Sequence, residues 1–259
     1  MSVTPPLAVQ LYSVREQAER DLPGTLRRLA ACGYTAVEPY AWHGATPRDF
    51  QRLLRSNGLD VVGFHCSLEN PADWPAAVDA AAEIGARLIV VPWSDPDTLH
   101  TLDDVERLAA RIETARAVVA TRGLALGYHN HWWEHARRIE DATLHQHLLA
   151  RLHPDVFVEL DVYWTAFGRR DPVAVLHELG PRVRLIHLKD GPADAEESLM
   201  TALGDGTLDL PGILAAARHV EAHVVEIDAC EGDIFVALER SATRVRTWTS
   251  GASEARSET

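Results

Sequence analysis

The chain has 259 residues, of which 46% are apolar, and this suits one large α/β domain or two small ones with a substantial core. Its formal net charge of −13 and its lack of a basic stripe argue against nucleic acid or an anionic membrane as a partner. We see no signal peptide and no apolar run as long as a membrane span. Three widely spaced cysteines, Cys32, Cys66 and Cys230, are typical of reduced thiols in a cytoplasmic protein.

In the first half of the chain, strand-like apolar runs alternate with helical patterns. We expect strands at residues 7–12, 35–38, 59–65 and 87–92, and helices at about 23–33, 46–58, 74–84 and 102–121. Pro23 and Pro47 suit the first turn of a helix, and Thr46 suits an N-cap. Gly33 and Gly85 are placed to end two of these helices.

The second half continues the same alternation. We expect strands at residues 124–129, 155–161, 182–188 and 223–227, and helices at about 142–152, from 171–172 onward, at 211–220 and at 234–248. No Pro-, Gly- or Ser-rich linker divides the chain, so residues 1–248 should form a single domain. Residues 249–259 are small and polar, and we expect them to form a disordered C-terminal tail.

Eight strand–helix units of this kind predict a parallel sheet covered by helices. Eight units close naturally into a (β/α)₈ TIM barrel, whose active site lies at the C-terminal ends of the strands. An open doubly wound sheet is the alternative. The first strand is not followed by a glycine-rich dinucleotide motif, and no phosphate-binding P-loop is present, so the barrel is favoured.

Several of the expected strands end in residue types that can act as metal ligands. Asp161, His187 and Glu226 close the sixth, seventh and eighth strands, which would be adjacent around a barrel. One histidine with two carboxylates suits Mn²⁺, Mg²⁺, Co²⁺, Fe²⁺ or Zn²⁺. A fourth ligand should come from the fifth strand, where alternation points His129 and His131 to the same side. Each residue alone could be a cap or a structural group, but their shared position at one end predicts a metal site.

Other strand ends supply polar and aromatic groups that could contact a substrate. Lys189 lies two residues after His187 and should face the same side, as an acid/base group or in a simple ion pair. Glu134 follows the fifth strand and is a reserve ligand or acid/base group, or a surface charge. Tryptophans at a barrel mouth suit the C–H faces of sugars and exclude water. The candidate substrate-binding residues are Gln10, Glu38, His65, Trp93 and Trp164.

These segments resemble the xylose-isomerase-like TIM-barrel superfamily, which contains sugar phosphate isomerases and epimerases and AP endonuclease 2-like proteins. The resemblance is carried by Tyr-His-Asn-His at 128–131, Glu-Leu-Asp-Val-Tyr-Trp at 159–164, His-Leu-Lys-Asp at 187–190, Gly-Asp-Gly at 204–206 and Val-Glu-Ile-Asp at 225–228. It implies a divalent ion, most often Mn²⁺, held by Asp161, His187 and Glu226. In this family the fifth strand supplies a glutamate, and here His129 stands in its place.

The resemblance implies proton transfer next to a metal-bound carbonyl of a keto-sugar or polyol, as in an isomerase or epimerase. Glu226, His131 or Glu134 would be the base, and Lys189 an acid. Because one carboxylate of the epimerase pair is missing, a lyase or dehydratase acting on a keto-inositol or 3-keto-sugar is the alternative, and a non-catalytic sugar-binding barrel is a third. The acidic charge disfavours DNA repair. The family also implies homo-oligomers.

Overall fold

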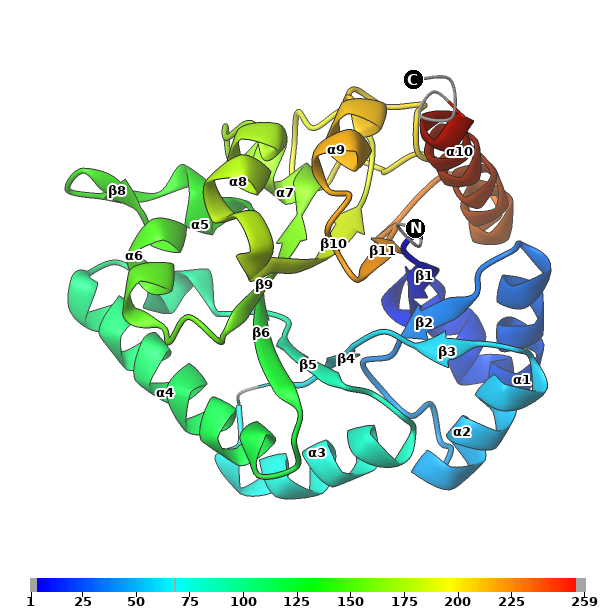
Figure 1. Ribbon diagram of the computed structural model, residues 1–259, viewed down its shortest axis with the longest axis horizontal. Helices are drawn as coiled ribbons and strands as arrows, with labels where there is room; N and C mark the ends of the chain where they lie inside the picture. Colours follow the sequence, from blue (N-terminus) through cyan, green and yellow to red (C-terminus); the bar gives the residue numbers. More distant parts are fainter. Residues whose placement is uncertain (1–3, 68, 255–259) are drawn as a thin grey trace.

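The computed structural model describes residues 4–67 and 69–254, which form a parallel barrel inside a ring of helices (Figure 1). The sheet order is β3-β2-β1-β11-β10-β9-β6-β5-β4, and every neighbouring pair is parallel. The strands are β1 (Leu7–Gln10), β2 (Ala36–Glu38), β3 (Asp60–Val61), β4 (Phe64–His65), β5 (Leu88–Val91), β6 (Ala125–His129), β9 (Phe157–Asp161), β10 (Val183–Leu188) and β11 (Ala222–Val225). The predicted TIM barrel is therefore confirmed.

The barrel closes through the third predicted strand, which is divided into β3 and β4. β3 pairs with β2, and β4 pairs with β5, so the two halves stand at opposite ends of the sheet order. The backbone N–H of His65 donates to the carbonyl of Pro39 (2.9 Å), and that of Cys66 donates to the carbonyl of Val90 (2.8 Å). One strand thus bonds to both of its neighbours. Gly63 lies at the break, where a Cβ atom would fall on the carboxylate of Glu38.

The helices around the barrel follow the expected units closely. They are α1 (Arg15–Ala31), α2 (Pro47–Ser56), α3 (Trp74–Glu83), α4 (Leu102–Ala120), α6 (Leu144–Arg151), α8 (Pro172–Leu179), α9 (Leu210–Ala216) and α10 (Ile234–Glu254). Thr46 caps α2 by accepting a hydrogen bond from the N–H of Asp49, with Pro47 in the first turn, as predicted. Gly33 follows α1 with a φ of 94°, which is the left-handed conformation that ends helices.

Two boundaries at the start of the chain differ from the prediction. A short 3₁₀ helix, η1 (Leu11–Val14), follows β1, and α1 begins at Arg15 rather than at Pro23. Asp21 breaks the helical backbone inside α1 (φ −155°, ψ 82°), and its Oδ1 accepts from the N–H of Gly24 (3.0 Å). The sequence pattern therefore located the second half of this helix, whose cap is Asp21 and whose first turn holds Pro23.

Two short helices and a hairpin were not expected. α5 (Trp132–Ala136) follows β6, α7 (Val162–Phe167) follows β9, and the strands β7 (Arg138–Ile139) and β8 (Ala142–Thr143) pair after α5. The helices contain mostly aromatic and β-branched residues, which have low helix propensity and are typical of strands. Local propensity therefore favours the wrong structure here, at the C-terminal ends of two strands.

The last helix is longer than predicted. α10 continues six residues beyond Trp248, to Glu254, and the hydroxyl of Thr249 donates to the carbonyl of Val245 (2.8 Å) within it. The segment 249–254 is therefore helical rather than a disordered tail, because it lacks a proline that would stop the helix. The rest of the predicted tail, residues 255–259, lies outside the described residues. Within the described part, no helix is long and apolar enough to cross a membrane.

The barrel interior changes from apolar to polar along the strands. At one level Phe157 and Leu185 pack together with side chains from β5 and β11. Two residues further along the same strands, the inward positions hold Glu159 and His187, because side chains on one face repeat every second residue. The register aligns His129 with Glu159 and His187 with Asp161. This alternation builds two polar layers above an apolar plug.

Candidate metal centre

The upper polar layer contains the four predicted metal ligands. Ligand atoms of His129, Asp161, His187 and Glu226 all lie within 4.8 Å of one another, and all four residues are buried. His129 Nε2 is 3.8 Å from Asp161 Oδ2, and His187 Nδ1 is 2.8 Å from Glu226 Oε2. The strand ends of β6, β9, β10 and the residue after β11 thus bring together groups that are far apart in the chain.

Lys189 belongs to the same layer. Its Nζ lies 3.3 Å from Asp161 Oδ2, 2.8 Å from Glu226 Oε2 and 3.1 Å from Asp228 Oδ2, and 5.5 Å from the centre of the Trp164 ring. Burial alone would lower the pKa of Lys189, but Asp228, Glu226 and Asp161 outweigh it and raise this pKa well above its usual value. Lys189 is therefore a buried ammonium beside the proposed ligands, not a solvated loop residue.

A lower layer of charged groups lies directly beneath. Glu159 Oε2 is 2.8 Å from His65 Nε2 and 3.1 Å from His129 Nδ1. Glu38 Oε2 is 2.7 Å from His187 Nε2 and accepts a hydrogen bond from Gln10 Nε2 (2.9 Å). The predicted substrate-binding residues Gln10, Glu38 and His65 thus lie inside the barrel, under the predicted ligands.

Sequence reasoning missed Glu159 as a site residue. It is fully buried and contacts histidines from three strands. The signal was present, because Glu159 lies two residues before Asp161 on the same strand and must face the same way. A carboxylate in the middle of an apolar strand is costly to bury unless it is paired.

Two histidines lie between the upper and the lower layer. In each ring, one nitrogen faces a carboxylate of the upper layer and the other faces a carboxylate of the lower layer. His129 faces Glu159 with Nδ1 and Asp161 with Nε2. His187 faces Glu38 with Nε2 and Glu226 with Nδ1. A carboxylate that accepts the N–H of one ring nitrogen fixes the tautomer and leaves the other nitrogen free to bind a metal. The lower carboxylates are placed to do this for both rings.

The two histidines of the upper layer have opposite pKa shifts. Burial would lower the pKa of His187, but Glu159 and Glu226 outweigh it and raise this pKa well above its usual value, so a bound ion would have to displace the proton of this ring. Burial, with help from nearby His187, lowers the pKa of His129 to about 3, so its imidazole is neutral, as a ligand must be.

Burial raises the pKa of Asp161 to about 6 although Lys189 opposes this. Asp161 Oδ1 accepts from the N–H of Trp164 (2.8 Å), whereas Oδ2 lies 3.3 Å from the Lys189 ammonium and accepts no hydrogen bond from any described residue. A buried carboxylate oxygen that accepts no hydrogen bond, beside the neutral imidazole of His129, suits a divalent ion.

An aromatic wall borders this layer. The half-buried ring of His131 stacks on Trp133 (4.5 Å between centres, 10° between planes) and meets the edge of His129 (5.1 Å). Burial keeps the pKa of His131 well below its usual value, so the ring is neutral. Trp93 is 46% exposed and contacts Trp133 edge-on. With Trp164, these rings provide the apolar surface that was expected beside the ligands.

Glu134 lies behind this wall and not among the ligand atoms. Its Oε1 accepts from the hydroxyl of Tyr128 (2.7 Å), and its Oε2 accepts from the backbone N–H of His131 (2.9 Å). Burial raises its pKa to about 7, although these hydrogen bonds oppose the shift. In this arrangement Glu134 caps α5 and holds the backbone of His131, so it reaches the site only indirectly.

Asn130 and Asp190, which follow His129 and Lys189 in the sequence, form hydrogen bonds with the backbone around the site. Asn130 Oδ1 accepts from the N–H of Asp161 (3.0 Å), and its Nδ2 donates to the carbonyl of Asp161 (3.3 Å). Asp190 accepts from the N–H groups of Gly191, Gly204 and Gly206. These side chains fix one ligand strand and one loop, because they alternate with the ligands along their strands and face the opposite side.

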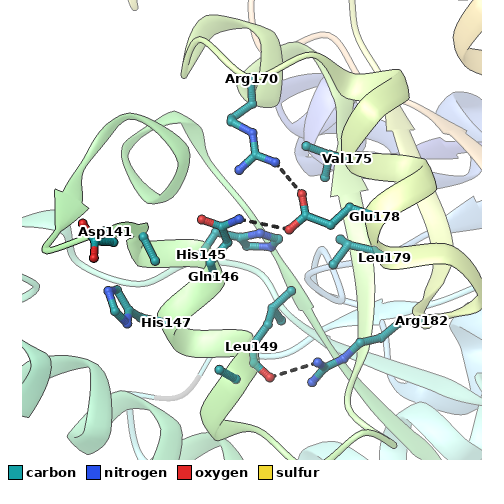
Figure 2. Close-up of a pocket in the computed structure, with 12 residues that line it drawn as sticks. Asp141, His145, Gln146, His147, Leu149, Arg170, Val175, Glu178, Leu179 and Arg182 are labelled. Atoms are coloured by element: carbon teal, nitrogen blue, oxygen red, sulfur yellow. Dashed lines mark hydrogen bonds and ion pairs between the residues drawn. The ribbon is translucent and has the colours of Figure 1, made fainter.

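A cavity of about 500 Å³ lies outside the barrel, between α6 and α8 (Figure 2). Glu178 crosses it and pairs with Arg170 (2.5 Å) and with the amide of Gln146 (3.0 Å). Arg182 donates to the carbonyl of Leu149 (2.9 Å). No predicted site residue lines this cavity. The ligand-type side chains of the prediction converge inside the barrel instead.

Several solved structures are similar to this chain in fold. A sugar phosphate isomerase/epimerase from Parabacteroides distasonis has a TM-score of 0.81 at 24% identity, over 93% of each chain. The "probable 3-DHS dehydratase AsbF involved in the petrobactin synthesis" from Bacillus anthracis has a TM-score of 0.74 at 14% identity, over 93% of this chain and 98% of the other. A xylose isomerase domain protein from Alicyclobacillus acidocaldarius has a TM-score of 0.74 at 18% identity, over 96% and 99%.

At these identities, the solved structures establish the fold alone. No curated protein matches the chain. The family described as "Xylose isomerase-like TIM barrel" matches residues 26–231, which is most of the chain and includes every residue of the upper layer. The chain therefore belongs to the xylose isomerase-like TIM-barrel family.

Proposed function

We propose that the chain is a divalent-metal-dependent sugar isomerase or epimerase, which moves a proton next to the carbonyl of a keto-sugar or polyol. The observation that carries this proposal is the convergence of two imidazoles and two carboxylates on one buried point, beside a lysine and an aromatic wall. Membership of the family supports it, and so does the isomerase/epimerase name of the Parabacteroides distasonis protein.

His129, Asp161, His187 and Glu226 would hold the ion. When bound, a divalent ion acts as a Lewis acid toward a carbonyl and a neighbouring hydroxyl of the substrate. We expect Mn²⁺ because the family favours it, although this donor set also accepts Mg²⁺, Co²⁺, Fe²⁺ and Zn²⁺. Glu38 and Glu159 would keep the two histidine rings in the tautomers that leave His129 Nε2 and His187 Nδ1 free.

The side chains beside the ligands supply the acid and the base. We assign the base to the neutral imidazole of His131, which contacts His129, or to the carboxylate of Glu226, which belongs to the upper layer itself. Lys189 Nζ is protonated and can donate a hydrogen bond, or its proton, to a substrate oxygen that becomes negative. Trp133 and Trp164 would pack against the sugar ring and exclude water.

A lyase or dehydratase is the second candidate. The fifth strand supplies His129 instead of the glutamate that would complete a pair of proton-moving carboxylates, and Lys189 is a buried acid that could protonate a departing hydroxyl. The Bacillus anthracis neighbour is named as a dehydratase. In this reaction the base would remove the proton next to the carbonyl, and the bond to a β-hydroxyl would then break, releasing water.

Proton exchange tests the proposal directly. The manganese-loaded protein is incubated in D₂O with a panel of keto-sugars and keto-inositols, and NMR and mass spectrometry follow deuterium at the carbon next to the carbonyl. We expect uptake for the true substrate class, and loss of both uptake and bound metal in Asp161→Asn. Isomerisation keeps the substrate's mass apart from deuterium, whereas dehydration lowers it by one water. Absence of exchange and turnover across the panel, with metal bound, would favour a binding protein.

A further inference from the structure

We propose that the cavity between α6 and α8 is a second binding site, which takes a small organic acid with an apolar body (Figure 2). Its volume of about 500 Å³ lies within the range of small-molecule sites. None of the described residues that line it belongs to the upper or the lower layer of the barrel. The site is therefore separate from the metal centre, and it does not depend on the reaction proposed above.

The walls of the cavity combine apolar side chains with a few polar groups. Leu149 of α6 and Val175 and Leu179 of α8 provide apolar surface. The buried ring of His145 also lines the cavity, and burial lowers its pKa to about 4, so this ring is neutral. Apolar walls with a small number of placed polar groups are typical of sites for small organic molecules.

The carboxylate of Glu178 shows what the polar groups of this cavity can hold. Its Oε2 accepts from Arg170 Nη2 (2.5 Å), and its Oε1 accepts from Gln146 Nε2 (3.0 Å). A guanidinium and an amide thus bind the two oxygens of one carboxylate. The same two donors are suited to the carboxylate of an organic acid.

Glu178 can leave this position at little cost in stability. Its side chain is 41% exposed and that of Arg170 is 25% exposed, and ion pairs with this much solvent around them contribute little. The Glu178 side chain can therefore turn to solvent while the carboxylate of a ligand takes its place. The described residues offer no acceptor to Nε and Nη1 of Arg170, so its guanidinium can bind the incoming carboxylate through two nitrogens.

The charge around the cavity favours an acid once Glu178 has moved. Arg182 donates to backbone carbonyls, which fix its guanidinium as part of the wall. The remaining arginine and acidic side chains of the lining are then Arg170, Arg182 and Asp141. Asp141 is exposed and lies apart from Arg170 in Figure 2. Among these groups the positive charge exceeds the negative charge by one, which favours an anionic ligand.

The competing account is that Glu178 only connects α8 to Gln146 and Arg170, and that the cavity holds solvent. The two accounts differ in the effect of removing the charge of Glu178. If Glu178 is only a connection between helices, this change creates no affinity for acids. If the cavity is a binding site, the change removes a carboxylate that competes with the ligand.

The test uses benzoate as the probe and benzamide as its neutral counterpart of nearly the same shape. Binding to the full-length protein, loaded with Mg²⁺, is measured by NMR titration. We expect benzamide to bind at least about tenfold more weakly than benzoate. Arg170→Gln should weaken benzoate binding by about tenfold or more, and Glu178→Gln should tighten it by about two- to fivefold. Circular dichroism confirms that each variant is folded.

The matched control is Arg151→Gln. Arg151 is another half-buried arginine, which ends α6 and pairs with Glu106, but it does not line the cavity. Its replacement should leave the affinity for benzoate unchanged. Crystals of the wild type soaked with 4-bromobenzoate should show an anomalous bromine peak between α6 and α8, and this measurement needs no variant.

A carboxylate can also bind a metal ion, so the location of the probe decides the outcome. Benzoate binding that is lost in Asp161→Asn but unchanged in Arg170→Gln would overturn the cavity site and leave the proposed function standing. A bromine peak among the upper ligands alone would do the same. Equal binding of benzoate and benzamide, or no binding of benzoate to Glu178→Gln, would also overturn the site.

Discussion

The protonation state of each buried charged residue depends on the groups that surround it. Lys189 contacts three carboxylates and is shielded by Trp164, so it stays protonated in an interior position. Glu134 is buried among hydroxyl and backbone donors without a cationic side chain. The first arrangement raises the pKa of an ammonium, and the second raises the pKa of a carboxyl. At neutral pH, Lys189 therefore keeps its charge, whereas Glu134 can lose its charge by binding a proton.

Replacing Lys189 should separate catalysis from metal binding. Because Lys189 donates no ligand atom, Lys189→Ala should retain bound manganese. If its ammonium is the acid, kcat should fall by about 10²-fold or more. Lys189→Arg keeps the charge but cannot readily give up a proton, and it is the matched control for an electrostatic role. An unchanged kcat in Lys189→Ala, with metal content intact, would reduce Lys189 to a structural ion-pair partner.

Glu134 should impose a pH dependence on stability. Its pKa rises from 4.5 to about 7 on folding, so the folded state binds the proton more tightly than the unfolded state. Its stabilising contribution is complete below about pH 4.5 and is lost as the pH rises through about 7. Urea unfolding should therefore show Glu134→Gln gaining stability over the wild type across this window, by roughly 3 kcal/mol at most. The exposed Glu231→Gln should not gain, and a constant difference for Glu134→Gln would contradict the assignment.

At the scale of elements, helix α4 is a good test of local sequence signals. Thr101 accepts from the N–H of Asp104 (3.2 Å), and the Asp104 carboxylate accepts from the N–H of Thr101 (2.7 Å), which is a complete capping box. Thr101→Ala should destabilise the protein by about 1 kcal/mol in chemical unfolding. Thr114→Ala, at an exposed position within the same helix, is the control and should change stability by less than half of this. Equal effects at both positions would show that the cap contributes nothing.

Prediction from the sequence succeeded where a cap, a proline or an apolar run was enough to locate a helix or a strand. Thr46 followed by Pro47 fixed the start of α2, and apolar runs located every strand of the barrel. It failed at α7, whose residues Val162 to Phe167 favour a strand by propensity and are helical because Asp161 caps them. For the site, the strand ends identified the upper layer. Glu159 was missed although its spacing from Asp161 places it on the same side of the strand, because only the pairing of the strands shows that it meets three histidines.

At the scale of the whole molecule, the buried charges link metal binding to folding. Two layers of carboxylates and imidazoles fill the space above the apolar plug of the barrel. An ion that binds only the folded state stabilises it by RT ln(1 + [L]/Kd), about 2.7 kcal/mol at a free concentration of 100 Kd. Chelation should therefore lower the melting temperature, and added Mn²⁺ should restore it.

The control for this effect is Asp161→Asn with Glu226→Gln, in which the upper ligands are disabled. Its melting temperature should not respond to Mn²⁺. A response equal to that of the wild type would mean that the stabilising ion binds elsewhere.

Gly63 has a consequence for how this site can vary in evolution. Only the missing side chain at this break in the third strand leaves room for the Glu38 carboxylate, which Gln10 and His187 hold in place. Homologous sequences should therefore change positions 38 and 63 together. A glutamate at 38 should be accompanied by glycine at 63, and a larger residue at 63 should appear only with a shorter side chain at 38. The lower layer would then be inherited as a unit, and lineages that lost it should have filled the space left by both residues.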